Sequence, residues 1–211
     1  MSNQIRYRLQ PAWWVMTVLA IAVAGYAFVF PFIDKMGDSG MREKFASMPL
    51  AAWGHMIWGG LALLIGPFQL NKSLRRNSIG RHRLLGRVYL ICVLLSGIAA
   101  LVLAFSANGG LAASLGFAGL GIGWLVTGAL AFTTIRKGDV AAHRRWMIRN
   151  YALTLAAVTL RIYLPVAMVS GLPFVPAYIA ISWLCWVPNV LVAEWYFIRR
   201  PDKRSVRRAV A

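Results

Sequence analysis

Long apolar runs with charges at their ends constrain this chain more than any other feature. Crossing a bilayer takes about 20 helical residues, and six runs of that order follow one another along the 211 residues. They span residues 13–32, 50–70, 82–105, 111–135, 141–169 and 173–198. With 59% hydrophobic and 14% charged residues, the composition excludes a soluble globular domain. We therefore predict an all-α, polytopic membrane helical bundle of about six transmembrane helices, forming a single integral membrane domain over residues 1–211.

Lysine and arginine gather in alternate connections between these runs. Residues 71–87 hold six, residues 136–149 hold five and the tail at 199–211 holds six. The three in residues 33–49 are balanced by Asp34, Asp38 and Glu43. Because basic residues are retained on the cytoplasmic side of a membrane, we expect both termini in the cytoplasm, the C-terminal one as a basic tail over residues 199–211.

The formal net charge of +17 raises the question of a nucleic-acid partner. The charges, however, collect at the ends of apolar runs, where they meet anionic lipid head groups and fix orientation. The predicted partner is thus the lipid bilayer with its anionic head groups, and not nucleic acid.

The three histidines divide into two layers of the predicted membrane domain. His82 and His143 lie near the cytoplasmic ends of their helices, whereas His55 lies near the outer end of its own. Two histidines at one depth predict a bis-histidine site for one b-type haem, with His82 and His143 as iron ligands and Arg83 and Arg144 near the propionates. The alternative is that both histidines meet lipid phosphate at the interface.

A polar stripe runs along the fifth apolar run. Counting from His143 at about 100° per residue, Asn150, Thr154 and Arg161 return to the same side of one helix. Arg161 lies deep in the run, at the height of His55, and a charge within the membrane needs a partner. That partner could be a carbonyl group, Tyr163 or Tyr178, or an anionic ligand, and the alternative is that Arg161 snorkels to the outer head groups.

The sixth run carries its own polar residues. Glu194 lies near the cytoplasmic end, which places it closer to Arg149 or His143 than to Arg161. Asn189 follows Pro188, so this helix is expected to bend and to form a hydrogen bond to a neighbouring helix.

Small residues recur at helical spacing along several of these helices. Gly59 and Gly66 share a side with His55, and Gly119 and Gly123 form a GxxxG motif. Such positions make room for a flat porphyrin, or they let two helices pack closely without any ligand. Both interpretations follow from the sequence.

No hydrolytic or nucleotide-dependent active-site motif occurs in the chain. Cys92 and Cys185 lie inside apolar runs and are typical of small core residues. A redox role is the one enzymatic class that the histidines leave open.

Five motifs stand out along the chain: H-x4-G at 55–60, G-P-x-Q at 66–69, HRLLGRVY at 82–89, HRRWMIR at 143–149 and TLRIYLP at 159–165. Together they resemble a bacterial family of predicted multi-pass membrane proteins, classed as a domain of unknown function. The resemblance implies six to seven membrane helices and leaves the substrate undefined. The placement of histidines at helix ends is also loosely similar to membrane b-type cytochromes, which usually place two ligands on one helix, as no helix does here.

Three functions follow as expectations for a multi-pass protein of the bacterial inner membrane. The first is a b-type haem-binding redox or haem-handling protein that uses His82 and His143. The second is a non-redox protein that binds or transports an anionic lipid, a quinone or a small organic anion. Its ligand-binding residues would be His55, Asn150, Thr154, Arg161 and Glu194. The third is an accessory subunit of a membrane complex, or a homo-oligomer, whose neighbours supply the partner of Arg161.

Overall fold

The computed structural model describes residues 11–33 and 39–199, and within these ranges it contains helices and no strand. Asp34 and Asp38, and the predicted basic tail beyond Arg199, lie outside the described residues.

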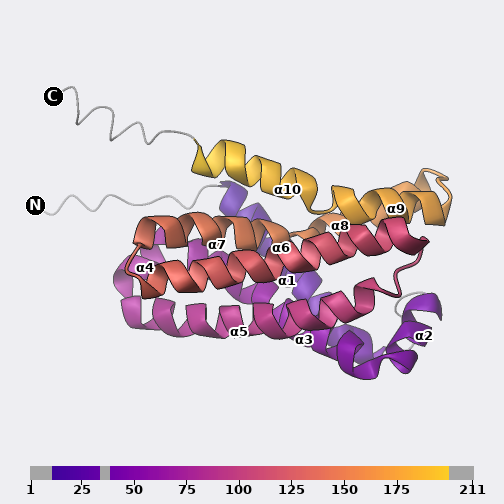
Figure 1. The fold of residues 1–211 in the computed structure, drawn as a ribbon, viewed down its shortest axis with the longest axis horizontal. Helices are drawn as coiled ribbons and strands as arrows, with labels where there is room; N and C mark the ends of the chain where they lie inside the picture. The colour runs from indigo at the N-terminus through magenta and orange to yellow at the C-terminus, as the bar shows by residue number, and fades with distance from the viewer. Residues whose placement is uncertain (1–10, 34–38, 200–211) are drawn as a thin grey trace, which may run out of the picture.

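Six helical segments of this part of the chain are long and apolar enough to span a membrane. They form one elongated bundle of roughly parallel and antiparallel segments (Figure 1). The spans begin and end close to the predicted bounds, so the all-α membrane fold is confirmed. They are α1 (Pro11–Val29), α3 (Pro49–Leu70), α5 (Ile79–Ala104), α6 (Gly110–Arg136), α7 with α8 (Val140–Thr154 and Ala156–Val169), and α9 with α10 and η2 (Phe174–Leu184, Val187–Val192 and Ala193–Ile198).

Three shorter elements lie in the connections. A 3-10 turn, η1 (Phe30–Phe32), ends the first span, and α2 (Ser39–Ser47) and α4 (Lys72–Asn77) lie at opposite ends of the bundle (Figure 1). The sequence predicted loops at these last two positions. Both are short amphiphilic or basic segments without an apolar run, so hydropathy alone gave no signal for them.

Hydrogen bonds and backbone conformation explain where several helices begin and end. The Asp139 side chain accepts a hydrogen bond from Ala142 N at 2.8 Å and caps α7. Gly138 and Gly171, which end α6 and α8, have φ values of +79° and +75°. Glycine adopts this left-handed conformation without steric cost, so it closes a helix where other residues would be strained.

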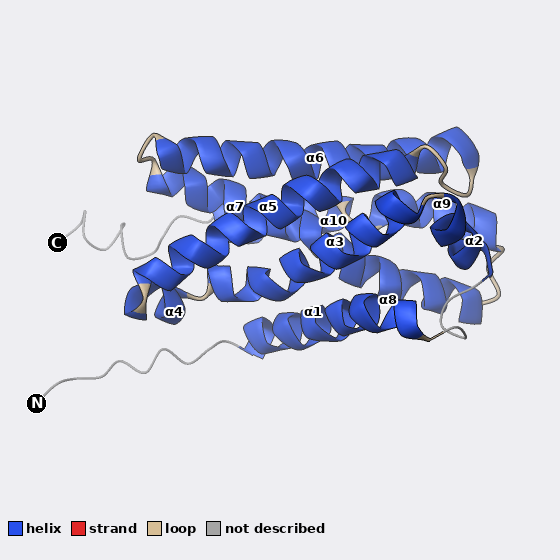
Figure 2. Ribbon diagram, turned by 90° about the horizontal axis from the view of Figure 1, so that it is seen from below, coloured by secondary structure: helices blue, strands red, loops and turns tan. Residues whose placement is uncertain are grey.

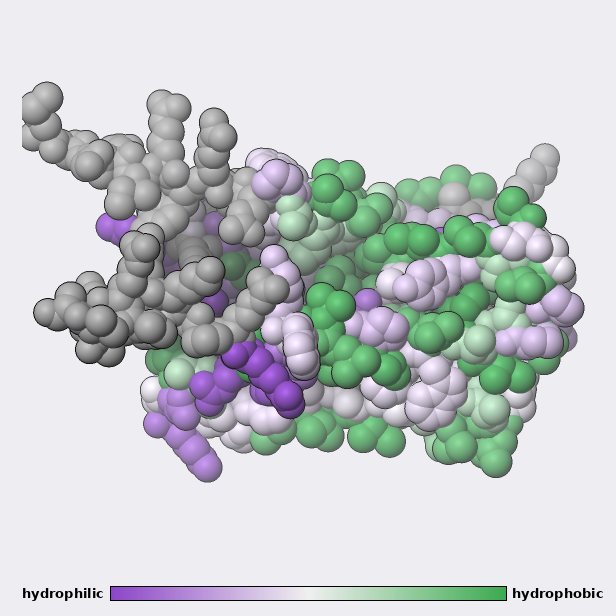
Figure 3. All heavy atoms as spheres, turned by 90° about the horizontal axis from the view of Figure 1, so that it is seen from above, coloured by the Kyte–Doolittle hydropathy of each residue, from purple (hydrophilic) through white to green (hydrophobic). Residues whose placement is uncertain are grey.

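The surface matches a protein embedded in lipid. Hydrophobic side chains cover most of the visible flank of the bundle, and the most hydrophilic ones gather toward the end that carries α4 (Figure 3). Large apolar residues such as Leu94, Val126 and Leu191 are exposed to the surroundings. This outward apolar band is what a bilayer requires of a bundle.

The last two spans are both broken near the middle of the bundle. α7 and α8 meet at Leu155, and α9 and α10 are separated by Cys185 and Trp186. Asn189 joins the two breaks, because its amide nitrogen lies 3.3 Å from Ala152 O and 3.0 Å from Cys185 O. The predicted hydrogen bond of Asn189 to a neighbouring helix is thus confirmed. Side-chain donors of this kind satisfy the backbone carbonyl groups that a break in a membrane helix leaves without hydrogen bonds.

The order of the helices in space brings chain-distant segments together. α3 packs along α5, α5 along α6 and α6 along α7. α1 and α8 also lie side by side, although more than a hundred residues separate them in sequence (Figure 2). Residues of α1, α3 and α8 surround the cavity that forms the candidate site.

Candidate functional site

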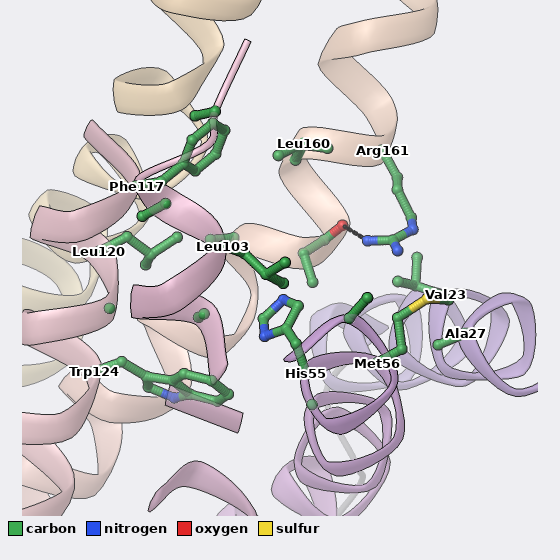
Figure 4. A pocket seen from close by; sticks show the side chains of 18 of the residues that line it. Val23, Ala27, His55, Met56, Leu103, Phe117, Leu120, Trp124, Leu160 and Arg161 are labelled. Carbon is green, nitrogen blue, oxygen red and sulfur yellow. Dashed lines mark hydrogen bonds between the residues drawn. The ribbon is translucent and has the colours of Figure 1, made fainter. Parts of the chain in front are cut away.

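A cavity of about 320 Å³ lies in the half of the bundle that carries α2. Residues of α1, α2, α3, α5, α6, α7, α8 and α9 line it, and most of them are apolar. Two strongly polar side chains, His55 and Arg161, enter it from the helices α3 and α8 (Figure 4), and Asn108 lines it from the connection between α5 and α6. Apolar walls with few polar groups are typical of small-molecule sites.

His55 is held by Ser96 on α5. Its Nδ1 lies 3.0 Å from Ser96 Oγ and 3.2 Å from Ser96 O. Since a carbonyl oxygen can only accept, Nδ1 must carry the hydrogen. Ser96 Oγ donates its own hydrogen to His55 O at 3.0 Å, so it too accepts from Nδ1. In the neutral imidazole, Nε2 therefore has a free lone pair.

Gly59 makes room for this contact. A Cβ at position 59 would lie 2.9 Å from Ser96 Oγ. The small residue one turn after His55 thus lets α3 and α5 approach closely enough for the histidine–serine pair.

Arg161 reaches the cavity without a carboxylate partner. Its Nη1 donates to Ala157 O at 3.2 Å, and its guanidinium carbon lies 5.0 Å from the centroid of the Tyr26 ring. A guanidinium has about five N–H groups to donate, so most of them remain available. Among the described residues, the ion-pair distance of 4 Å is met for Arg149 and not for Arg161. The carbonyl partner was one of the alternatives predicted, whereas the Tyr26 ring was not.

An aromatic wall borders the cavity. Phe117 and Phe174 each pack against Tyr178, with ring centroids 5.4 Å and 5.3 Å apart. Trp124 lines the inner end of the cavity (Figure 4). The sequence does not single out Phe117 or Phe174, because aromatic residues in apolar runs are ordinary core or lipid-facing residues. Neither residue carries a local signal of a site.

Asn150 does not face the cavity, although the sequence placed it with Arg161. Its side chain is fully buried, and its amide nitrogen donates to Trp124 O at 2.7 Å and to Thr127 Oγ1 at 2.9 Å. Tyr89 Oη donates to Asn150 Oδ1 at 2.7 Å. Both amide hydrogens of Asn150 and one lone pair of its Oδ1 thus serve the packing of α5, α6 and α7.

Thr154 borders the cavity but its hydroxyl is occupied. Thr154 Oγ1 lies 2.9 Å from Tyr89 Oη, receives the Trp124 Nε1 hydrogen at 2.9 Å and donates to Asn150 O at 3.0 Å. Thr154 therefore lines the cavity without offering its hydroxyl group to a ligand.

Glu194 forms an ion pair with Arg149, one of the two partners the sequence favoured. Arg149 Nε bonds to Glu194 Oε1, and Arg149 Nη2 donates to Oε2 at 3.1 Å. The Arg149 guanidinium also lies 4.4 Å from the centroid of the Trp146 ring. This pair joins α7 to η2 toward the α4 end of the bundle, and neither of its residues lines the cavity.

His82 and His143 occupy one layer at that same end. The Tyr89–Asn150 hydrogen bond fixes the register of α5 against α7. His82 lies seven residues before Tyr89, and His143 lies seven residues before Asn150. Two turns of helix, about 10 Å, therefore separate both histidines from the bond, on the same side of each helix. The equal depth predicted from the sequence follows from this register.

The two rings differ in their surroundings. His143 Nδ1 lies 2.8 Å from Ala131 O, which fixes the hydrogen on Nδ1 and leaves Nε2 as an acceptor. His82 Nδ1 is buried and has no hydrogen-bond partner in the described part of the chain. Arg83 and Arg144, which directly follow the two histidines, are exposed. No group of three or more metal-ligating side chains occurs among residues 11–33 and 39–199.

The glycine stripe of α3 is filled by protein. A Cβ at Gly66 would lie 1.9 Å from the Tyr151 ring, and Gly60 would meet Phe28 at 3.1 Å. Gly119 and Gly123 similarly face Trp186 and Leu153. Of the two interpretations of these glycines, helix packing is the one that this arrangement supports.

Fold and site together define a multi-pass α-helical membrane protein with a mostly apolar cavity inside the bundle. Residues 52–197 match the family model described as "Predicted membrane protein (DUF2306)", and the chain belongs to this family. The resemblance predicted from the motifs is thereby confirmed. Comparisons with curated proteins and with solved structures gave no match.

Proposed function

We propose that this protein binds a small amphipathic ligand within the membrane, with the ligand's polar head group between His55 and Arg161. Of the functions expected from the sequence, this is the non-redox binding or transport of an anionic lipid, a quinone or a small organic anion. The observation that carries the proposal is Arg161, a cation inside an apolar cavity whose guanidinium has no carboxylate partner among the described residues. An intramembrane charge is costly unless something polar meets it.

The size and lining of the cavity support the same class of ligand. About 320 Å³ lies at the lower end of the range of small-molecule sites. The walls would accept a ring or a short length of chain, and the rest of an amphipathic tail would extend into the surrounding lipid. We place the protein in a bacterial inner membrane, with the α4 end toward the cytoplasm, because the arginine-rich connections gather there.

Removing the charge of Arg161 should weaken binding by roughly ten- to hundredfold. A hydrogen bond to a charged group contributes about 1.5–3 kcal/mol, which converts to that range. Arg161→Met retains much of the length of the side chain and removes its donors. Native mass spectrometry of the solubilised protein, titrated with decanoate and with a decyl-substituted benzoquinone, would give the affinities.

The matched control is Arg87→Met, because Arg87 is exposed on α5 near the α4 end and does not line the cavity. This variant should bind both probes like the unchanged protein. Equal binding of both probes by Arg161→Met and Arg87→Met would show that Arg161 only anchors α8 in the bundle.

The layer of His82 and His143 favours a second candidate function, the binding of one b-type haem. The supporting observation is the common depth of the two rings, together with the fixed Nε2 lone pair of His143 and the unpartnered Nδ1 of His82. A haem bound there would supply one-electron redox chemistry, with Arg83 and Arg144 near its propionates.

Protein purified after haem-replete expression should then show a Soret band that sharpens on reduction. His82→Ala or His143→Ala should remove the band, whereas His55→Ala, in the other half of the bundle, should retain it. A colourless protein would refute the haem-binding function and leave the cavity proposal intact.

A further inference from the structure

We infer that the head group bound in the cavity is a hydroxylated ring, a phenol or hydroquinone, which donates a hydrogen bond to His55 Nε2 and accepts one from Arg161. This inference rests on the proposed function and narrows its amphipathic ligand to a hydroxylated ring, in place of the quinones and anions that the proposed function also admits. It follows from three features of the cavity: the hydrogen position on His55, the free donors of Arg161 and the aromatic wall.

The hydrogen position on His55 decides what the ligand must offer. Ser96 O accepts from Nδ1 at 3.2 Å, and Ser96 Oγ, which donates to His55 O, accepts from Nδ1 as well. The imidazole cannot exchange its tautomer without leaving Nδ1 and Ser96 O as two facing acceptors. Nε2 makes no hydrogen bond to the described residues, and the ring points into the cavity (Figure 4). A ligand beside the neutral His55 ring must therefore donate a hydrogen bond to Nε2.

Arg161 imposes the opposite requirement. A guanidinium has only donors, and here one of them is used by Ala157 O. A head group that satisfies both side chains must carry a hydrogen-bond donor and an acceptor oxygen. An ester or a quinone offers acceptors alone, so it would leave Nε2 unpaired. An ionised carboxylate has the same deficiency toward a neutral imidazole.

The aromatic wall selects a ring among the molecules that carry a hydroxyl group. Phe117, Trp124 and Tyr178 border the cavity, and the indole nitrogen of Trp124 is already bonded to Thr154 Oγ1. Its ring is thus held as a fixed apolar surface. Aromatic rings attract one another beyond the burial of their area, which favours a planar ring over an alkyl alcohol.

The test compares four probes with the same tail: a decyl-substituted hydroquinone, its quinone, its di-O-methyl ether, and decanoate. Titrations are followed by native mass spectrometry, anaerobically for the hydroquinone. The hydroquinone should bind about tenfold more tightly than the ether or the quinone, since an unpaired buried acceptor costs about 1–3 kcal/mol. Decanoate should bind more weakly than the hydroquinone.

His55→Asn is the informative variant, because its amide can still donate to Ser96 while the Nε2 acceptor is lost. It should bind the hydroquinone and the ether alike. Equal affinity of the unchanged protein for hydroquinone and ether, or a preference that survives in His55→Asn, would overturn this inference. Binding that depends on Arg161 but favours decanoate would overturn it while leaving the proposed function standing. Failure of every probe to bind would refute both.

Discussion

Gly66→Ala should lower the stability of the folded protein by about 3 kcal/mol or more, the upper range for overpacking a core. The new Cβ would lie 1.9 Å from Cε2 and 2.2 Å from Cδ2 of Tyr151. That ring is 2% exposed and its hydroxyl donates to Leu63 O at 3.3 Å, so it has no space to retreat into. In a thermal-unfolding assay of the solubilised protein, Tm should fall by about 6–12 °C, at about 2–4 °C per kcal/mol for a chain of this size.

Gly25→Ala is the matched control for this substitution. Gly25 is exposed on α1 and a Cβ there would meet nothing within 4 Å. We expect its Tm to change little, since surface substitutions stay within about 0.5 kcal/mol. Replacing the opposing ring provides a second check. In a Tyr151→Leu background, Gly66→Ala should lower the stability much less than it does in the unchanged protein. Similar Tm values for Gly66→Ala and Gly25→Ala would show that α3 and α7 do not pack as described.

Asn150→Ala should have the second-largest effect, a loss of about 2–3 kcal/mol. Three hydrogen bonds end on this fully buried side chain, two donated to Trp124 O and Thr127 Oγ1 and one accepted from Tyr89. Removing the amide takes these three hydrogen bonds out of the bundle interior, and each such bond contributes about 0.5–1.5 kcal/mol net. The cavity left by the shortened side chain adds to that cost. Thermal unfolding again measures the effect.

Two variants frame the result for Asn150. Thr133→Ala removes an exposed hydroxyl on the outside of α6 and should leave Tm nearly unchanged. Tyr89→Phe removes one hydrogen-bond donor of the same network. The double variant should therefore lose less stability than the sum of the losses of Tyr89→Phe and Asn150→Ala. Full additivity of the two substitutions would indicate that the network does not act as a unit.

These predictions separate the core from the site, a division that the sequence did not make. On one continuous helix, His143, Asn150, Thr154 and Arg161 form a single polar stripe. The chain instead ends α7 at Thr154 and begins α8 at Ala156. The break lets α7 pack against α6 while α8 packs against α1 and α9. The stripe is thereby divided between a buried hydrogen-bond network and an open cavity.

The amino-acid sequence by itself determined the membrane class, the six spans and the layers in which the polar side chains lie. Hydropathy and helical rise are properties of consecutive residues, so they fix the depth of His55, Arg161, His82 and His143 before any helix meets another. Depth also limited the expected partners of Glu194 to Arg149 and His143, and the structure pairs it with Arg149.

Only the tertiary structure decided which side chains at one depth face each other. Ser96 holds His55, Tyr26 lies against Arg161, and Tyr151 fills the space at Gly66. Each of these contacts joins helices separated by many residues, and it depends on the rotation of every helix about its own axis. That rotation is set by how side chains interlock across the interfaces. The pattern along one helix does not contain it, and the cavity between His55 and Arg161 exists only through it.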